Sequence, residues 1–137
     1  EIDSKLLKVL LDHDYLPVIS SLGAHAEGKV FNINADTIAS EIAVQLNAEK
    51  VVLVSDVDGI YLPAGSAKTK LSRMTADEAD ELIKNGAATG GMVPKLQNII
   101  DALRRGVRSA HIINGNYRNA LLAEVFTNEG TGTMIVA

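Results

Sequence analysis

Apolar residues along the chain alternate between a helical spacing and the short runs that are typical of strands. The leucines between residues 6 and 11 recur at helical intervals, and Asp3 or Ser4 can cap the start of that helix. Further helices are predicted after Asp36, after Thr75, after Pro94 and over residues 120–126. Strands are predicted over residues 15–20, 30–33, 51–54, 110–113 and 133–136.

The run Val51–Val54 contains only valine and leucine, a pattern found in strands that are buried on both faces of a parallel sheet. Strand-like and helical segments alternate, which predicts an α/β fold with a mostly parallel sheet and helices on both faces. The segment from Ser55 to about Ser72 is predicted to be a loop. Ligands bind at the carboxyl ends of the strands in such sheets, so the residues after Val54 and after Ile113 are the first candidates for chemistry.

Composition narrows the classes of protein to consider. The chain has 137 residues, of which 47% are hydrophobic, 22% are charged and none is cysteine. This is the balance of a single globular domain, and it excludes a disulfide framework, a thiolate zinc site and a cysteine nucleophile. The net charge of −4 gives no basic field for nucleic acid or anionic lipid, and no apolar run reaches the ~20 residues that span a bilayer. We therefore expect a cytoplasmic protein without nucleic-acid or membrane partners.

The first polar cluster joins an extended segment to a helix start. Asn32, Asn34 and Asp36 stand at alternate positions, so their side chains can point the same way from an extended backbone. The amides could bind a carboxylate or acyl-amide group, and Asp36 could hold a lysine in position. The competing interpretation is that Asp36 only caps the helix and the asparagines only form a turn.

The second cluster follows the predicted buried strand directly. It contains Ser55, Asp56, Val57, Asp58, Gly59, Ile60 and Tyr61. Carboxylates at a strand end can accept hydrogen bonds from a ribose or an adenine amino group, and a tyrosine can flank a base. The alternative is a loop whose acidic residues are merely solvated.

The third cluster lies between two predicted helices, with Pro94 in the first turn of the second helix. It consists of Gly86, Ala87, Ala88, Thr89, Gly90, Gly91, Met92, Val93, Pro94 and Lys95. Glycines let backbone amides approach phosphate oxygens, and Lys95 could reach a transferring phosphoryl group. The alternative is a plain linker. The chain has neither a Walker G-x-x-x-x-G-K-[ST] motif nor a G-x-G-x-x-G motif, and no metal-ligand spacing. His111, in a buried context, is predicted to be structural or a hydrogen-bonded neighbour.

Taken together, the order and spacing of these clusters resemble the acetylglutamate kinases of the amino-acid kinase family. The matching stretches are Asn32–Thr37, Leu53–Tyr61, Leu71–Ile83, Gly90–Lys95 and His111–Ile135. The resemblance implies a three-layer αβα sandwich with an open, mostly parallel sheet. It also implies phosphoryl transfer from ATP, with Mg²⁺ carried by the nucleotide, to the side-chain carboxylate of N-acetyl-L-glutamate in arginine biosynthesis.

The resemblance also assigns roles to residues. Asp36 and Lys95 are implied to be catalytic, and Asn32 with Asn34 to bind the substrate. The segments 55–61 and 87–91 are implied to contact the nucleotide. His111, Glu124, Gly130 and Gly132 resemble the effector site of the arginine-inhibited branch.

The 137 residues are expected to be a single domain that forms the C-terminal, ATP-binding portion of such a kinase. The family's N-terminal substrate-binding domain has no counterpart in them, so we expect weak nucleotide binding and no turnover from these residues alone. The full-length form is expected to be a homo-oligomer. Alternatives are a related kinase with another acceptor, a non-catalytic arginine-sensing domain and a domain that only mediates assembly.

Overall fold

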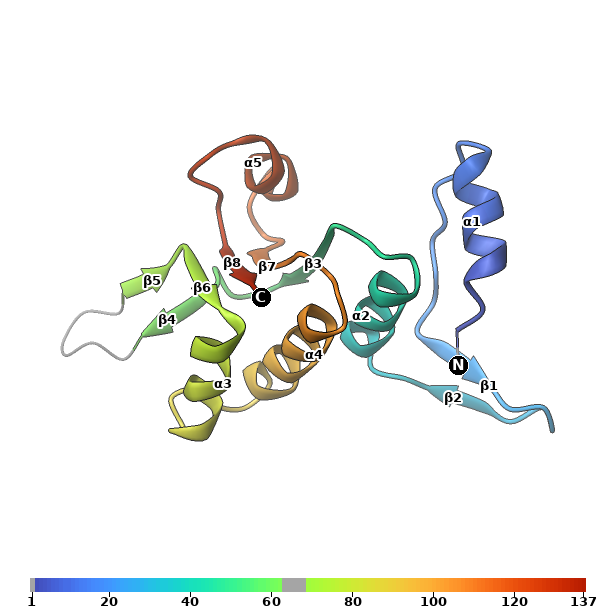
Figure 1. Cartoon of the computed structure of the whole chain (residues 1–137), viewed down its shortest axis with the longest axis horizontal. Coiled ribbons are helices and arrows are strands. Elements are labelled where there is room, and N and C mark those ends of the chain that lie inside the picture. Colours follow the sequence, from blue (N-terminus) through green and yellow to red (C-terminus); the bar gives the residue numbers. More distant parts are fainter. Residues whose placement is uncertain (1, 63–68) are drawn as a thin grey trace.

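The computed structural model describes residues 2–62 and 69–137, and a four-stranded sheet lies at the centre of the fold (Figure 1). The helices are α1 Ser4–Asp12, α2 Ala35–Gln45, α3 Ala76–Lys84, α4 Met92–Arg104 and α5 Ala120–Phe126. The strands are β1 Leu22–Ala24, β2 Val30–Asn32, β3 Lys50–Ser55, β4 Ile60–Leu62, β5 Thr69–Leu71, β6 Arg73–Thr75, β7 Ser109–Asn114 and β8 Thr133–Val136.

The central sheet has the strand order β3-β7-β8-β6. β3 pairs with β7 in parallel and β6 pairs with β8 in parallel, whereas β7 and β8 are antiparallel. All six residues of β7 are buried, because it lies between two strands and is covered on both faces. The predicted mostly parallel sheet is confirmed.

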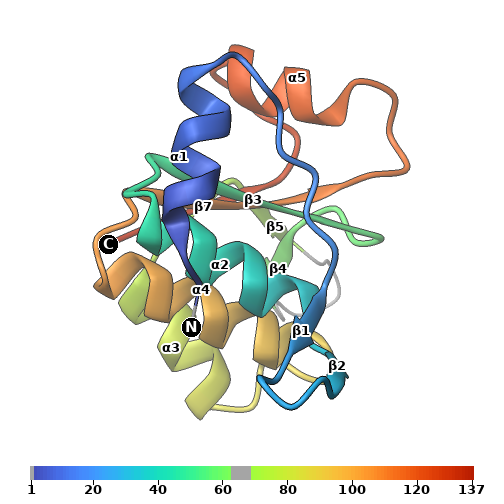
Figure 2. The same cartoon turned by 90° about the vertical axis from the view of Figure 1, so that its right-hand side faces the viewer.

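Helices cover both faces of this sheet. α2, α3 and α4 lie below it in Figure 1 and α5 lies above it, and Figure 2 shows α2 and α4 side by side. The predicted stripe of α4 faces the core: Leu96, Ile99, Ile100 and Leu103 are all buried. The α/β class and the three-layer arrangement are therefore confirmed. No helix in the described part of the chain is long and apolar enough to cross a bilayer.

Local sequence signals explain where the helices begin. The side chain of Thr75 accepts from the backbone N–H of Glu78, and the Glu78 carboxylate accepts from the backbone N–H of Thr75, so the predicted capping box is present. Asp3 caps α1 as expected. The cap of α2 is Asn34 rather than Asp36, because the helix begins at Ala35 and places Asp36 in its first turn.

Three other predictions are wrong. Residues 15–20 form no strand among the described residues. The described parts of the segment 55–72 form the antiparallel pair β4–β5, after which β6 begins. The strand at 51–54 is not buried on both faces, since Val54 is 59% exposed. Its valine run suggested a covered strand, but β3 is at the edge of this sheet.

Apolar side chains are also more exposed than the sequence suggested. They lie on α1, on residues 15–19, on β2 and on α5, and Val18 is 93% exposed. An open apolar cavity of about 710 Å³ separates α1 and residues 17–23 from α2. This part of the fold buries little of its own hydrophobic surface, whereas the core belongs to the sheet with α2, α3 and α4.

The capping box gives a direct test of how α3 is stabilised. Thr75→Ala should lower the free energy of unfolding by about 1 kcal/mol, because the N–H of Glu78 loses its acceptor. Glu78→Ala removes the reciprocal bond, so the double variant should lose less than the sum of the two single losses. Urea unfolding of the four proteins measures this. Strictly additive losses would show that the two bonds do not act as one motif.

Candidate functional site

The amino ends of α2 and α4 meet through an ion pair between two predicted catalytic residues. Lys95 Nζ donates to Asp36 Oδ2 at 2.6 Å, and the two side chains are only 20% and 22% exposed. The next residue of α2, Thr37, donates its hydroxyl to the side-chain oxygen of Asn98 at 3.3 Å, and Asn98 lies about one turn after Lys95 in α4. The amino ends of α2 and α4 lie close together (Figure 2), and the pair places an acid and a cation at that point.

Helix electrostatics favour one of these charges and disfavour the other. The amino end of a helix carries partial positive charge, which stabilises Asp36 in the first turn of α2. Lys95 stands in the first turn of α4, where a cation is unfavourable. A residue that opposes its local environment indicates a functional site, and Asp36 supplies the compensation.

The amino end of α4 is open. Its N-cap, Gly91, makes no side-chain capping hydrogen bond, and Gly90 has a positive φ of 58°. A Cβ at either glycine would meet nothing within 4 Å, so the backbone here faces free space. The N–H groups of Met92 and Val93 donate to the carbonyls of Thr89 and Gly90 at 3.2 and 3.3 Å. A phosphate would therefore approach the glycine backbone before the helix, next to Lys95.

A pocket of about 610 Å³ lies beside this helix end. It is lined by Asp56, Val57, Asp58, Gly59, Ile60, Tyr61, Leu82, Ala87, Ala88, Thr89 and Met92. The structure thus joins the second and third clusters, and Met92 links the pocket to the turn that carries Lys95. Ser55 lies outside the lining, and its hydroxyl donates to Asp56 Oδ1 at 3.2 Å. Leu82 was missed, although its position shortly before the glycine-containing segment could have suggested it. Met92 belongs to the third cluster but was given no role in binding.

Asp58 is held from within the protein. Its carboxylate accepts from Asn114 Nδ2 at 2.6 Å and from the Tyr61 hydroxyl at 3.2 Å. The hydrogen bond from Asn114 lowers the pKa of Asp58, whereas burial and the nearby Asp58 charge raise the pKa of Tyr61. Sequence reasoning pointed to the residues after Ile113 but gave Asn114 no role. Asn114 pairs with Ser55 in the parallel register and so ends its strand at the same sheet edge.

The two asparagines near α2 differ in hydrogen bonding and in exposure. Asn34 Oδ1 accepts from the backbone N–H of Thr37 at 3.1 Å, so this side chain is engaged in capping. Asn32 ends β2 and its side chain is exposed. Of the two, Asn32 is the more available to a ligand, and α2 brings Asn34 close to the Lys95–Asp36 pair.

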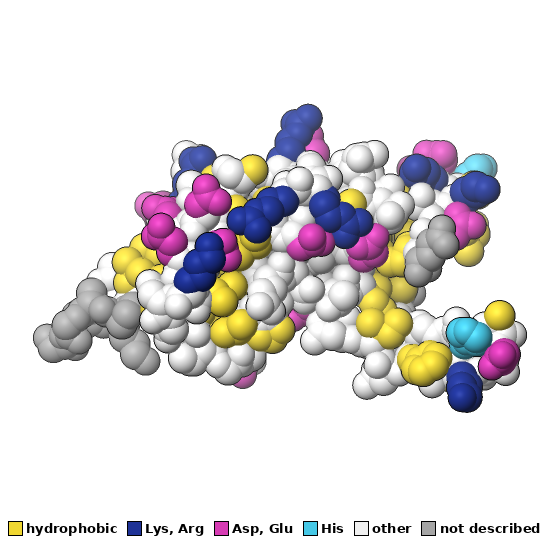
Figure 3. Space-filling view, turned by 60° about the horizontal axis from the view of Figure 1, so that its bottom comes forward, with side chains coloured by type: hydrophobic (Ala, Val, Ile, Leu, Met, Phe, Trp, Pro, Cys, Tyr) yellow, Lys and Arg dark blue, Asp and Glu magenta, His cyan; other side chains and the backbone are white. Residues whose placement is uncertain are grey.

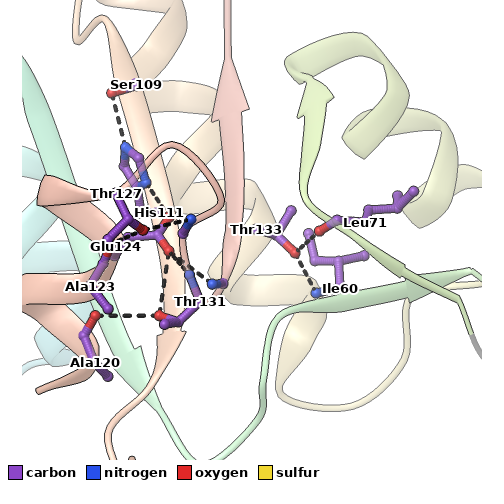
Figure 4. Close-up of polar contacts among 12 residues, drawn as sticks. Ile60, Leu71, Ser109, His111, Ala120, Ala123, Glu124, Thr127, Thr131 and Thr133 are labelled. Atoms are coloured by element: carbon purple, nitrogen blue, oxygen red, sulfur yellow. Dashed lines mark hydrogen bonds and ion pairs between the residues drawn. The ribbon is translucent and has the colours of Figure 1, made fainter. Parts of the chain in front are cut away.

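A buried polar cluster lies on the other side of the sheet, around α5 (Figure 4). His111 Nδ1 donates to Glu124 Oε1 at 2.7 Å, and Ser109 contacts the other ring nitrogen at 3.3 Å. Glu124 Oε2 accepts from the backbone N–H groups of Thr131 and Gly132 at 2.6 and 2.8 Å. Both oxygens of the carboxylate therefore have partners inside the protein.

Close packing accompanies this cluster. A Cβ at Gly130 would lie 2.8 Å from Glu124 Oε2, and one at Gly132 would collide with the carbonyl of Ile112. The structure therefore brings the four predicted effector residues together, but with Glu124 buried and fully engaged.

Ion pairs on the outer helical face are separate from the pocket. Basic and acidic side chains are mixed across that face (Figure 3). Arg105 donates to both oxygens of Glu41 at 2.6 and 2.9 Å, and these bonds lower the pKa of Glu41 to about 2. The pair joins the end of α4 to α2, so it is a structural contact. No three acidic or histidine side chains gather as metal ligands among the residues that the structure describes.

Comparison with known proteins identifies relatives of the whole chain. The chain is 46% identical over 135 residues to acetylglutamate kinase of Methanocaldococcus jannaschii, covering 98% of this chain and 45% of the relative. It is 49% identical over 138 residues to acetylglutamate kinase of Methanocorpusculum labreanum, covering 100% of this chain and 46% of the relative. The chain spans about half the length of the curated relatives it matches.

Solved structures agree with the fold. N-acetylglutamate synthase from Neisseria gonorrhoeae, complexed with coenzyme A and L-arginine, superimposes with a TM-score of 0.91 at 32% identity. The match covers 99% of this chain and 31% of that one. The sequence profile of the Amino acid kinase family matches residues 1–114. The chain therefore belongs to the amino acid kinase family.

Proposed function

We propose that the chain supplies the nucleotide site of an enzyme that transfers a phosphoryl group from ATP to the side-chain carboxylate of N-acetyl-L-glutamate. The observation that carries the proposal is the Lys95–Asp36 ion pair at the joined amino ends of α2 and α4. Next to it lie the open helix end at Gly90–Gly91 and the pocket of about 610 Å³. A cation, a glycine backbone that a phosphate can approach closely and a base-sized pocket lie next to one another, and a nucleoside triphosphate requires these three features.

The pocket accounts for the nucleoside part. Leu82 and Met92 offer apolar surface to a base, and Tyr61 can flank it. Asp56 is the carboxylate best suited to accept from the ribose or the adenine amino group, because Asp58 is already bonded to Asn114. Mg²⁺ would enter with the nucleotide, since this ion keeps several waters and binds mainly to phosphate oxygens.

Phosphoryl transfer needs positioning and positive charge more than covalent help from the protein. Lys95 would neutralise charge on the transferring phosphoryl oxygens, and Asp36 would hold the ammonium in place. The acceptor carboxylate is already ionised at neutral pH, so no general base is required. Asn32 is the described residue best suited to contact the acceptor, because its side chain is exposed beside the start of α2.

The identity of the acceptor rests on the relatives that are named acetylglutamate kinases. A kinase that acts on another carboxylate or carbamate remains the alternative, and a substrate panel on a polypeptide with both halves separates the two.

We also propose that the protein is cytoplasmic, which the lack of cysteine supports, and that its full-length form is a homo-oligomer. Exposed apolar side chains on α1 and α5 favour such assembly.

A second candidate function is arginine binding near the loop that follows α5. It is favoured by the buried His111–Glu124 pair, which orders residues 131–132, and by the similar synthase structure that contains L-arginine. Because both oxygens of Glu124 are engaged, a guanidinium group would be received mainly by backbone carbonyls of this loop, with Glu124 holding the loop in shape. Glu124 would then act as an indirect determinant of arginine affinity.

Replacement of Lys95 tests the main proposal. Lys95→Met should lower the rate of acetylglutamate-dependent ATP consumption at least a hundredfold in a polypeptide that carries both halves, a loss of about 3 kcal/mol or more. In the 137-residue chain, calorimetry should show a reduced preference for ATP over AMP, because Lys95 lies beside the phosphate end of the pocket. Lys84→Met, which removes an exposed lysine on α3, should change neither. An unaltered rate in Lys95→Met would exclude the assigned role.

Calorimetric titration with L-arginine tests the second candidate function. L-arginine should bind the wild-type chain in calorimetry, and Glu124→Ala should abolish the binding because residues 131–132 lose their acceptor. Glu49→Ala, which removes an exposed acid paired with Arg108, serves as the control and should bind arginine normally. Absence of binding to the wild-type chain, or its persistence in Glu124→Ala, would argue against this site.

The Glu124 carboxylate also predicts a pH dependence of stability. Burial alone would raise its pKa, but the hydrogen bonds from His111, Thr131 and Gly132 outweigh burial and hold the pKa below the ordinary value of 4.5. The charged form therefore stabilises the fold above that value, and this stabilisation is lost as pH falls through the lowered pKa. Glu124→Gln should cost about 1–3 kcal/mol at neutral pH.

The difference from wild type should shrink on acidification, because glutamine does not titrate. Urea unfolding of both proteins at neutral pH and at about pH 3.5 measures this. A constant or growing difference at acid pH would mean that the carboxylate is not the stabilising form.

A further inference from the structure

Thr133 lies where the last strand meets the loop that lines the pocket. Its side chain is completely buried, with 0% exposure. Its hydroxyl oxygen accepts from the backbone N–H of Ile60 at 2.9 Å, and the hydroxyl donates to the carbonyl of Leu71 at 2.5 Å (Figure 4). One side chain thus connects β8 to both strands of the β4–β5 hairpin.

The two groups that Thr133 binds stand opposite each other in the hairpin. Ile60 and Leu71 are partners in the antiparallel register, and Ile60 also lines the pocket. Buried backbone groups need hydrogen-bond partners. Without the hydroxyl, the N–H and the carbonyl would remain unsatisfied or this end of the hairpin would move. Thr133 therefore fixes the position of Ile60 relative to the central sheet.

The residue before Ile60 lies directly against the same hydroxyl. Gly59 has a φ of +133°, and a Cβ there would be 2.5 Å from Thr133 Oγ1. Only glycine adopts this conformation without strain and leaves room for the contact. Both Gly59 and Ile60 line the pocket. The contacts with the Thr133 side chain therefore determine the conformation of this part of the pocket wall.

The position of Thr133 is itself secured from the opposite side. Residues 131 and 132, which lead into β8, donate their N–H groups to the buried carboxylate of Glu124. Glu124 is held in turn by His111 on β7. The residues just before Thr133 are therefore held to the central sheet by hydrogen bonds. Thr133, which is held in this way, in turn fixes the position of Ile60 in the pocket.

We propose that Thr133 is a positioning residue for nucleotide binding, because its hydroxyl holds Gly59 and Ile60 in the conformation that receives the nucleotide. The inference rests on the proposed function, in which this pocket binds ATP. Thr133 is not itself among the pocket-lining residues and acts through Ile60. A loop that is ordered before binding loses less freedom when the ligand arrives, so loss of the hydroxyl weakens binding.

Calorimetric titration of the 137-residue chain with ATP tests the inference. Thr133→Val keeps the volume and removes both hydrogen bonds, whereas Thr133→Ser keeps the hydroxyl. We expect Thr133→Val to raise the Kd for ATP roughly tenfold, which corresponds to about 1.4 kcal/mol, and Thr133→Ser to stay within about twofold of wild type. Amide exchange at Ile60 should become faster only in Thr133→Val.

A second threonine separates positioning from general stability. Thr75→Val removes the cap of α3 and should lower the melting temperature while leaving the Kd for ATP unchanged. If Thr133→Val lowers the melting temperature in the same way but binds ATP like wild type, the inference is overturned. If Thr133→Val does not fold, Thr133→Cys, with a weakly hydrogen-bonding thiol, is judged by the same criterion. If the wild-type chain binds no ATP, the proposed function itself fails, which is a distinct result.

Discussion

The parallel pairing of β3 with β7 is the constraint on which the site depends. The two strands run together over six residue pairs, from Lys50 with Ser109 to Ser55 with Asn114. Because the strands are parallel, their carboxyl ends lie at the same edge of the sheet. The loop after Ser55 and the polar side chain of Asn114 therefore meet, and the bond from Asn114 to Asp58 fixes the loop that forms one wall of the pocket.

The charge pair near the pocket depends on helix packing rather than on strands. α2 and α4 lie side by side because α4 buries its stripe of Leu96, Ile99 and Leu103 in the core. Their shared direction brings Asp36 and Lys95 to one place, although they are 59 positions apart along the chain. The sheet and the helical layer thus contribute different chemistry, with hydrogen-bonding loops from the first and a charge pair from the second.

The sequence was sufficient where the signal is local. The capping box at Thr75, the stripe of α4 and the limits of α5 follow from spacing and capping alone, and the structure has them as expected. The sequence was insufficient where a residue far along the chain determines whether a segment forms a strand or which contact a side chain makes. Residues 15–20 have strand composition but find no partner strand in the described region, and the β4–β5 hairpin forms within a segment that looked like a loop. The role of Asn114 depends on strand register, and that of Thr133 on a contact with residues 60 and 71, so neither could be read from neighbouring residues.

Comparison of the carboxylates separates the structural groups from those available to a ligand. Asp58 is bonded to Asn114, Glu41 to Arg105 and Glu124 to His111 with two backbone N–H groups. A carboxylate with lowered pKa and a full set of internal donors gains little from a ligand, because each bond to the ligand would replace one already formed. Asp36 differs, since its partner is a lysine that stands against the dipole of its own helix and would gain a more favourable partner in a phosphate. In the proposed function, the Lys95 ammonium would contact a phosphoryl oxygen while it still donates to Asp36, because an ammonium group carries three N–H donors.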